Sequence, residues 1–527
     1  MTDRPTVAVI GAGFSGVLTA LRLLSAPDGP NVRLIEKGPR FGRGAAYATG
    51  SPHHLLNVRA TNMSAFVEQP SHFRDWLGSR GDGERMFVTR DEYGQYLQSL
   101  LREAASGPGA RRLVLEHDDA RELTRRDGRW AITLGVGRVL QADAVVLAIG
   151  NLPPPPPDGA DPEVLASRRY VADPWAWTGA ETAPGGEVLL LGSGLTAVDV
   201  ALSLEAARPG IRLTALSRHG LAPRAHAPTP AHAPGDDDEP RRRDRAPRGS
   251  PTTLLRQFRG RAGDDWRAAF DDLRPHVQAV WRGWTDAERR QFVRHLKPWW
   301  DVHRHRMAPQ VAAKIAALQA GGTLQFDAGR LVGLRPHRDG VEATWSPRGS
   351  DRRETRRFGL IVNCFGPRAD LQRSSDPLVE QLFVAGLARA DDCRLGLDVD
   401  VRSRVLNASG EPTPTLFAVG PISRGAYFEV SSVPDIRIQA AECADAVVNA
   451  LAVGGRPPSA DLPSSEPLGA ALSAWLARSV AEIDVELAAL KYSGRVRNAW
   501  ELRGRRAALG EIALWLDERE THSAEGA

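Results

Sequence analysis

Cysteine is scarce in this sequence, and the spacing of the few cysteines excludes several classes of site. The 527 residues contain three cysteines, Cys364, Cys393 and Cys443, and none of them is close to another. A disulfide framework, a structural zinc site and a CxxC redox pair all need cysteines at short, defined spacings. His53 and His54 are neighbours, but no cysteine, histidine or carboxylate follows at ligand spacing. We therefore expect no bound metal.

Long apolar runs are also missing, and no stretch is long enough to span a bilayer. Acidic Asp3 stands shortly before the first apolar run, which is untypical of a signal peptide. The net charge is only +4, and the densest basic run lies next to an acidic block, so a basic nucleic-acid face is not expected. The sequence predicts a cytoplasmic protein of two or three domains with neither membrane nor nucleic acid as a partner, and it leaves the oligomeric state open.

A glycine-rich fingerprint follows the first apolar run, Val7–Ile10, which is typical of a buried strand. The glycines have GxGxxG spacing and are Gly11, Gly13 and Gly16. The first permits a tight turn, the second lets the backbone approach a pyrophosphate, and the third lets helix and strand pack closely. A leucine-rich stretch with helical spacing comes next, and the following strand ends in Glu36, about 20 residues after the last glycine. Because all four parts are in register, this unit is predicted to bind a dinucleotide.

The acidic end of this unit indicates which dinucleotide it prefers. Glu36 can accept hydrogen bonds from a ribose diol and would repel a 2′-phosphate, while the helix N-terminus offers N–H groups and a positive dipole to the phosphates. Asp143–Gly150 ends a β-meander that starts at Leu113, which is typical of the return leg of a flavin-binding domain. We therefore expect FAD here, in contact with Gly11, Gly13, Phe14, Ser15, Gly16, Glu36, Lys37, Asn57, Ala120, Gly150, Gly420 and Pro421.

A second unit of the same kind begins with the apolar run Val188–Leu191. The sequence Gly192-Ser-Gly194-Leu-Thr-Ala197 follows, and the fingerprint allows alanine in the third glycine position. The next strand ends in Ser217 and Arg218 instead of an acidic residue, and these side chains suit a 2′-phosphate. This unit is predicted to hold NADPH through Gly192, Ser193, Gly194, Leu195, Thr196, Ser217 and Arg218.

The rest of the chain suggests four segments. The first part of the FAD domain would cover 1–157 and end in a stiff proline run that leads out of the domain. The NADP domain would cover 158–345, with a flexible surface insertion at 222–250 and a helical segment at 252–320. The chain would return to the FAD domain over 346–460 and end in a helical tail, 461–527. Within the helical segment, Phe292–Arg306 places polar groups beside aromatic rings, which suits either a substrate wall or a hydrogen-bonded core.

Several stretches resemble one known family. GRGAAYATGSPHHLLNVRATNMSAF, GSGLTAVDVALSL, LSRHGLAP, WDVHRHRMAP and FEVSSVPDIRIQA are similar to a bacterial FAD/NAD(P)-binding flavoprotein family that includes YdhS-like proteins. That family is distantly related to flavin-dependent N-hydroxylating monooxygenases. The chain lacks the histidine of the Baeyer–Villiger segment FxGxxxHxxx(W/F), since the region reads Tyr170-Val-Ala-Asp-Pro-Trp-Ala-Trp177. It also lacks the CxxC of disulfide reductases.

Together these features predict an α/β protein with two Rossmann-like dinucleotide-binding domains, one for FAD and one for NADP, with β-meanders and an added helical segment. The resemblance implies an FAD-dependent, NADPH-using monooxygenase that oxygenates a small polar substrate with dioxygen through a hydroperoxyflavin, for example by N-hydroxylation. An NAD(P)H:acceptor reductase and a flavin-binding regulatory protein are the alternatives. The candidate catalytic residues are Asn57, Met63, Ser64 and Arg306.

Overall fold

A computed structural model describes residues 4–26, 28–78, 87–177, 186–227, 246–263 and 265–454. The chain divides into two units, Met1–Val453 and Gly454–Ala527. The predicted helical tail at 461–527 and residues 228–245 of the predicted insertion lie outside the described residues.

The first sheet has six strands and is built around the strand that precedes the first fingerprint. Its order is β15-β16-β7-β1-β2-β3, and all pairings except β15 with β16 are parallel. The strands are β1 Thr6–Ile10, β2 Asn31–Glu36, β3 Leu113–His117, β7 Ala144–Leu147, β15 Arg404–Leu406 and β16 Pro412–Ala418. A strand with neighbours on both sides of a parallel sheet is buried on both faces. This burial explains the unbroken apolar run of β1.

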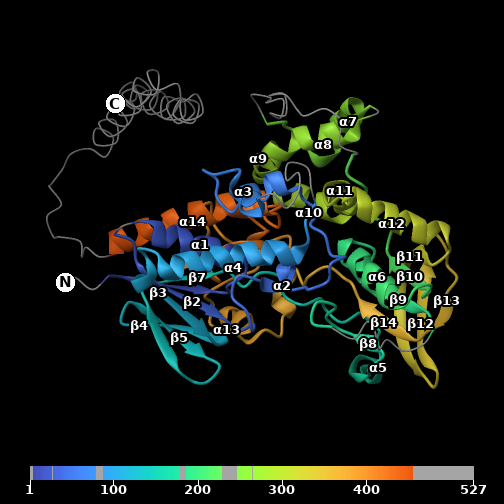
Figure 1. Cartoon of the computed structure of the whole chain (residues 1–527), viewed down its shortest axis with the longest axis horizontal. Coiled ribbons are helices and arrows are strands. Elements are labelled where there is room, and N and C mark those ends of the chain that lie inside the picture. The colour runs from blue at the N-terminus through green and yellow to red at the C-terminus, as the bar shows by residue number, and fades with distance from the viewer. Residues whose placement is uncertain are drawn as a thin grey trace, which may run out of the picture. The chain divides into compact units, whose positions relative to one another are not determined.

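Three long helices lie side by side along one side of this sheet (Figure 1): α1 Phe14–Ser25, α4 Arg90–Ser106 and α14 Val433–Gly454. α4 begins at a capping box in which Thr89 and Glu92 bond to each other's backbone N–H groups. The other side carries α13 and a three-stranded antiparallel sheet, which is the meander expected from the sequence. These elements are α13 Pro377–Val384, β4 Ala120–Arg126, β5 Arg129–Leu134 and β6 Val139–Ala142.

The second sheet has seven strands in the order β13-β12-β11-β10-β9-β14-β8. The strands are β8 Tyr170–Val171, β9 Val188–Leu191, β10 Leu213–Ser217, β11 Leu324–His337, β12 Gly340–Pro347, β13 Glu354–Phe358 and β14 Leu360–Asn363. The helices beside them are α5 Pro162–Ala166, α6 Leu195–Ala207 and α12 Pro309–Ala320. Two separate hydrophobic clusters lie against this sheet. The predicted fold class, with two dinucleotide-type α/β domains, is confirmed.

One expected boundary differs from the strand pairing. The sequence predicts that the chain returns to the first domain at 346, yet β13 pairs with β12, and β14 pairs with β9 in the second sheet. The return therefore begins after Asn363. The reason is that β14 takes the place in the second sheet that β7 has in the first, and the meander that leads to it belongs to the same domain.

Two antiparallel connections join the domains. Leu152, which follows β7, forms a bridge with Arg368, which follows β14. The Asn363 side chain donates to the carbonyl of Pro155 at 2.9 Å, so the end of β14 holds the predicted proline crossover in place. A buried contact adds to these links, because His54 of the first domain reaches the Asp199 carbonyl (3.1 Å) and the Ser203 hydroxyl (2.8 Å) on α6.

The predicted helical segment forms a group of short helices beyond the two sheets (Figure 1): α7 Pro251–Ala262, α8 Trp266–Leu273, α9 Val277–Gly283, α10 Asp286–His295 and α11 Lys297–Arg304. The start of the predicted insertion differs from expectation, since residues 222–227 are packed rather than lying free on the surface. Ala225 pairs with Met307, and His226 contacts the Asn57 carbonyl at 3.0 Å. The first is a backbone bridge and the second joins a side chain to a distant carbonyl, and the polar composition of the segment reveals neither.

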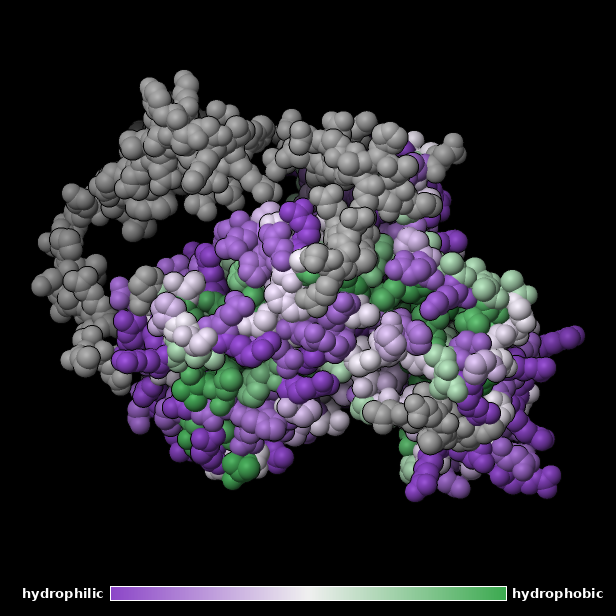
Figure 2. Space-filling view, viewed as in Figure 1, coloured by the Kyte–Doolittle hydropathy of each residue, from purple (hydrophilic) through white to green (hydrophobic). Residues whose placement is uncertain are grey.

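The surface in Figure 2 is mainly hydrophilic, with a hydrophobic patch over edge strand β3, where Val114 and Leu115 are exposed. None of the helices in the described part of the chain combines the length and apolar character needed to cross a bilayer. The same residues contain no group of three or more side chains suited to hold a metal ion.

Gly16 provides a test of the packing between α1 and β1. A Cβ atom at Gly16 would overlap the Gly11 carbonyl oxygen and lie 3.2 Å from the Ala148 Cβ. Because backbone cannot move aside cheaply, we expect Gly16→Ala to lower the free energy of unfolding of the apoprotein by about 1–3 kcal/mol or more. Gly50→Ala is the control, since a Cβ there meets nothing within 4 Å. Equal denaturation midpoints for the two variants would contradict the close packing.

Candidate cofactor sites

The first fingerprint forms a turn that only glycine can make. Gly11 has φ +100°, and a Cβ there would overlap the Ala148 carbonyl oxygen at the end of β7. Its N–H donates to the Ile35 carbonyl at 2.8 Å, which ties the turn to β2. Gly11 and Gly16 are therefore required by contacts within the protein itself.

Gly13 is different, because the polypeptide leaves room for a side chain there. A Cβ at this position meets only the Gly44 Cα, at an ordinary 3.5 Å. Gly13 is also the N-cap of α1 and has no side chain that could accept hydrogen bonds from the first N–H groups of the helix. The space in front of Gly13 and this helix end form a cradle of the kind that receives a pyrophosphate. The residues present thus fit a dinucleotide.

Glu36 fixes the walls of this cradle. One carboxylate oxygen accepts the Ala12 N–H and the other accepts the Gly38 N–H, each at 2.7 Å. Each oxygen has a further lone pair that can accept a bond from a ribose hydroxyl. Lys37 turns the other way and pairs with Asp376, the N-cap of α13, at 3.1 Å.

The loop after β2 closes over the fingerprint. The Gly42 N–H donates to the Ala12 carbonyl at 2.8 Å, and Gly44, at φ +54°, lies next to Gly13. Buried Arg43 holds this loop through a 2.5 Å ion pair with Asp91. Sequence reasoning missed Arg43. The available signal was Gly94 inside α4, because a Cβ there would lie 2.6 Å from the Arg43 guanidinium.

The last strand returns to the same cradle, as expected. Gly420 follows β16 with φ +79°, and a Cβ there would overlap the Ser15 hydroxyl. Pro421 opens a short 3-10 helix, Pro421–Ser423, and the Gly420 N–H donates to the Gln439 side chain at 2.8 Å. Gly420 and Ser15 are thus brought together from opposite ends of the chain.

Three other predicted contacts have different surroundings. Phe14 is buried against Tyr47 and Tyr93 in an aromatic cluster. Ala120 is buried at the start of β4, where it pairs with Leu134. Gly150 follows β7 with φ +69°, and a Cβ there would meet nothing within 4 Å.

The second fingerprint repeats the first. Gly192 has φ +119°, and a Cβ there would lie 2.5 Å from the Cys364 carbonyl oxygen, which follows β14. Gly194 is the open position, since a Cβ there meets nothing within 4 Å. Leu195 and Thr196 form the first turn of α6, and Ala197 is buried beneath it. This unit therefore contains a second cradle.

The end of β10 differs chemically from the end of β2. Ser193 donates to the Ser217 hydroxyl at 2.8 Å, so two predicted cofactor residues lie together. Arg218 is exposed next to them. The pKa of His219 lies below its usual value, mainly because of burial and to a lesser extent because of the charges of Arg348 and Arg218. Two cations therefore lie near this strand end, and Arg348 comes from the turn after β12, where no sequence motif marks it.

Two of the candidate catalytic residues support the framework. Met63 is 1% exposed, and its carbonyl accepts from the Tyr93 hydroxyl at 2.9 Å. Ser64 is 0% exposed and donates to the Gln69 carbonyl at 2.6 Å. The Asn57 carbonyl accepts from His226, whose pKa burial lowers to about 4, so that ring is neutral and donates through Nε2–H.

Arg306 takes part in a structural network of hydrogen bonds and ring contacts. Arg306 is 5% exposed, and its guanidinium donates two bonds to Asp271 at 3.1 and 3.2 Å and lies 5.1 Å from the Trp266 ring centre. Of the two alternatives left open for Phe292–Arg306, the hydrogen-bonded core is the one that applies to this residue. Arg304 is likewise paired, with Glu429 at 3.1 Å.

Comparison with known proteins agrees with this geometry. Residues 8–152 match the model of a family described as FAD-NAD(P)-binding, which confirms the cofactor class expected for the first domain. No curated protein matches the sequence.

Solved structures share the fold at low sequence identity. L-lysine 6-monooxygenase from Pseudomonas syringae has a TM-score of 0.58 at 16% identity, over 85% of this chain and 100% of that one. Ornithine N-hydroxylase from Kutzneria sp. 744 has 0.56 at 14%, over 84% and 99%. Bacillithiol disulfide reductase from Bacillus cereus has 0.51 at 14%, over 84% and 99%. These likenesses show that the fold is shared.

The two open glycines give a test that separates cofactor binding from folding. A Cβ at Gly13 or Gly194 fits the protein, so Gly13→Ala and Gly194→Ala should leave the denaturation midpoint of the apoprotein nearly unchanged. Gly13→Ala should weaken FAD binding because the methyl group lies where the pyrophosphate approaches. Gly194→Ala should retain FAD and lose affinity for NADPH. The measurements are flavin content and NADPH titration, and loss of FAD from both variants alike would contradict the assignment.

Proposed function

We propose that this protein is an FAD-dependent, NADPH-using monooxygenase. The observation that carries the proposal is the pair of cradles in one chain whose strand ends have opposite chemistry. Glu36 stands at the end of β2, whereas Ser217, Arg218 and Arg348 surround the end of β10. A carboxylate selects against a 2′-phosphate and cations select for it, so FAD belongs in the first cradle and NADPH in the second.

The roles of the residues follow from this assignment. The N-terminus of α1 and the open side of Gly13 would receive the FAD pyrophosphate, and Glu36 would hold its ribose. Ser217, Arg218 and Arg348 would orient NADPH by its 2′-phosphate. FAD held in this way would supply the redox chemistry of a monooxygenase, which is hydride acceptance and dioxygen activation. The protein positions the two cofactors and shields them from water.

The cysteines favour an oxygenase over a dithiol reductase. Burial raises the pKa of Cys393 to about 11 and that of Cys443 to about 12, and it raises that of Cys364 further. The thiolate is the reactive form, so such thiols are poor nucleophiles near neutral pH. The sequence also contains no closely spaced pair. Two of the structural neighbours are an ornithine N-hydroxylase and an L-lysine 6-monooxygenase, which is consistent with the proposal.

Oxygen uptake tests the proposed activity. The FAD-loaded protein is mixed with NADPH and a panel of small amines and amino acids, and oxygen, NADPH and hydrogen peroxide are followed together. A monooxygenase is expected to show a substrate that stimulates oxygen uptake and yields an oxygenated product in proportion to the NADPH consumed. NADPH oxidation that reduces only dyes or quinones would assign the protein to the acceptor reductases. No NADPH oxidation would indicate a flavin-binding regulatory protein.

Arg218 tests the choice of nicotinamide cofactor. Arg218→Ala removes a charge-assisted contact with the 2′-phosphate, and we expect the KM for NADPH to rise about tenfold while that for NADH changes little. Arg212→Ala is the matched control, because Arg212 is exposed just before β10 begins, at the opposite end of the strand. Steady-state kinetics with both cofactors give the answer. Equal rises for NADPH and NADH would contradict the assignment.

A further inference from the structure

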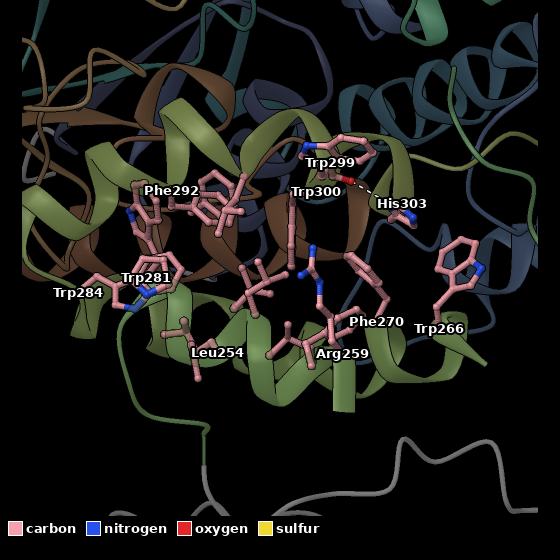
Figure 3. Close-up of a pocket in the computed structure, with 18 residues that line it drawn as sticks. Leu254, Arg259, Trp266, Phe270, Trp281, Trp284, Phe292, Trp299, Trp300 and His303 are labelled. Atoms are coloured by element: carbon pink, nitrogen blue, oxygen red, sulfur yellow. Dashed lines mark hydrogen bonds between the residues drawn. The ribbon is translucent and has the colours of Figure 1, made fainter. Parts of the chain in front are cut away.

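The helical group contains an aromatic cavity that lies outside both cofactor cradles. It is about 380 Å³ in volume and is lined mainly by residues of α7 to α11 (Figure 3). Ligand pockets range over about 300–1,000 Å³, so there is room for one small molecule. Aromatic rings dominate the wall, among them Phe270, Trp281, Trp284, Phe292 and Trp300.

The indole N–H groups of these three tryptophans already have hydrogen-bond acceptors. The indole N–H groups donate to the Gly425 carbonyl from Trp281 (2.7 Å), to the Gly249 carbonyl from Trp284 (2.8 Å), and to the Glu429 carboxylate from Trp300 (2.7 Å). The cavity is therefore lined by ring carbon, and its rings are held in fixed positions. Burying apolar surface there is worth about 25 cal/mol per Å², so the chamber favours an apolar body.

Loop residues that follow the FAD cradle form part of the same cavity. Phe428 lies in the wall, eight positions along the chain from Gly420, and its ring stacks on Trp281 at 4.5 Å. The Gln278 side chain donates to the Phe428 carbonyl. The cavity is thus fastened directly to the loop that leaves the first cradle.

One charged side chain enters this apolar surrounding. Figure 3 shows the Arg259 guanidinium reaching from α7 toward Phe270 and Trp300. Arg259 is exposed at the rim and, within the described part of the chain, takes part in no ion pair. The other titratable group in the wall, His303, donates Nδ1–H to the Trp299 carbonyl at 2.7 Å, and burial lowers its pKa, so it is neutral near pH 7. Arg259 is therefore the single full charge among the described lining residues.

We propose that this cavity binds an amphipathic anion, with its apolar body in the aromatic chamber and its carboxylate paired with Arg259. A guanidinium binds a carboxylate in bidentate geometry, and it would repel a cationic head group. The inference goes beyond the proposed function, because such binding needs neither NADPH nor dioxygen. Arg304 and Arg306 do not line the cavity, and their charges are already paired.

Three ligands with the same chain and different head groups test the proposal: decanoate, decanol and decylamine. They are titrated into the FAD-loaded full chain, and calorimetry and tryptophan fluorescence are followed. We expect decanoate to bind about tenfold or more tightly than decanol, and decylamine more weakly still. Leu254→Trp, which adds bulk to the wall, should abolish binding of decanoate while flavin content stays unchanged.

Arg259→Glu should reverse the order of the charged ligands, so that decylamine binds more tightly than decanoate. Arg256→Glu is the matched control, because Arg256 is an exposed arginine on the same helix that does not line the cavity. This variant should bind the three ligands in the same order of affinity as the native protein. Absence of decanoate binding by the native protein would overturn the proposal. Equal affinity for decanoate and decanol, or the same response from both glutamate variants, would overturn it as well.

Discussion

Both halves of this molecule depend on the same close contact between a glycine and a backbone carbonyl. In the first domain Gly11 lies against the carbonyl of Ala148, and in the second Gly192 lies against that of Cys364. Each carbonyl follows the strand that neighbours the fingerprint strand, β7 in one sheet and β14 in the other. A side chain at either glycine would push the turn away from the sheet. The contact therefore places each helix N-terminus at the carboxyl edge of its sheet, where α/β proteins bind ligands.

The two cradles share this frame, but they differ in the charged side chains at the ends of β2 and β10. At the first, the Glu36 carboxylate accepts hydrogen bonds from two backbone N–H groups and places negative charge at the end of β2. At the second, Arg218 and Arg348 bring positive charge to the corresponding strand end. The double connection beside Leu152 and the buried contact of His54 with α6 hold the two domains together. The repeated fold thus fits the two proposed cofactors, and the strand ends fit the proposed difference between them.

The sequence predicts the repeated part well because its signals are local. GxGxxG, the acidic strand end and the apolar stretch that closes the first meander at Gly150 each report on neighbours within a short stretch, and the fold class, the strand–helix–strand units and that meander follow from them. Long-range partners are not visible in this way. Arg306 looks like a free cation in its own segment, but its partner Asp271 is on another helix. The predicted return to the first domain at 346 comes too early for the same reason, since the pairing of β14 with β9 joins segments far apart in the chain.

Anaerobic reduction of the bound flavin tests the central claim most directly. The claim is that one chain holds FAD in the first cradle and receives a hydride from NADPH held in the second. The FAD-loaded protein is mixed with NADPH, and separately with NADH, without oxygen, and the visible absorbance of oxidised flavin is recorded over time. The account predicts that NADPH bleaches the flavin completely, and at lower concentrations than NADH does. A flavin that stays oxidised with NADPH, or that NADH reduces at lower concentrations, would contradict it.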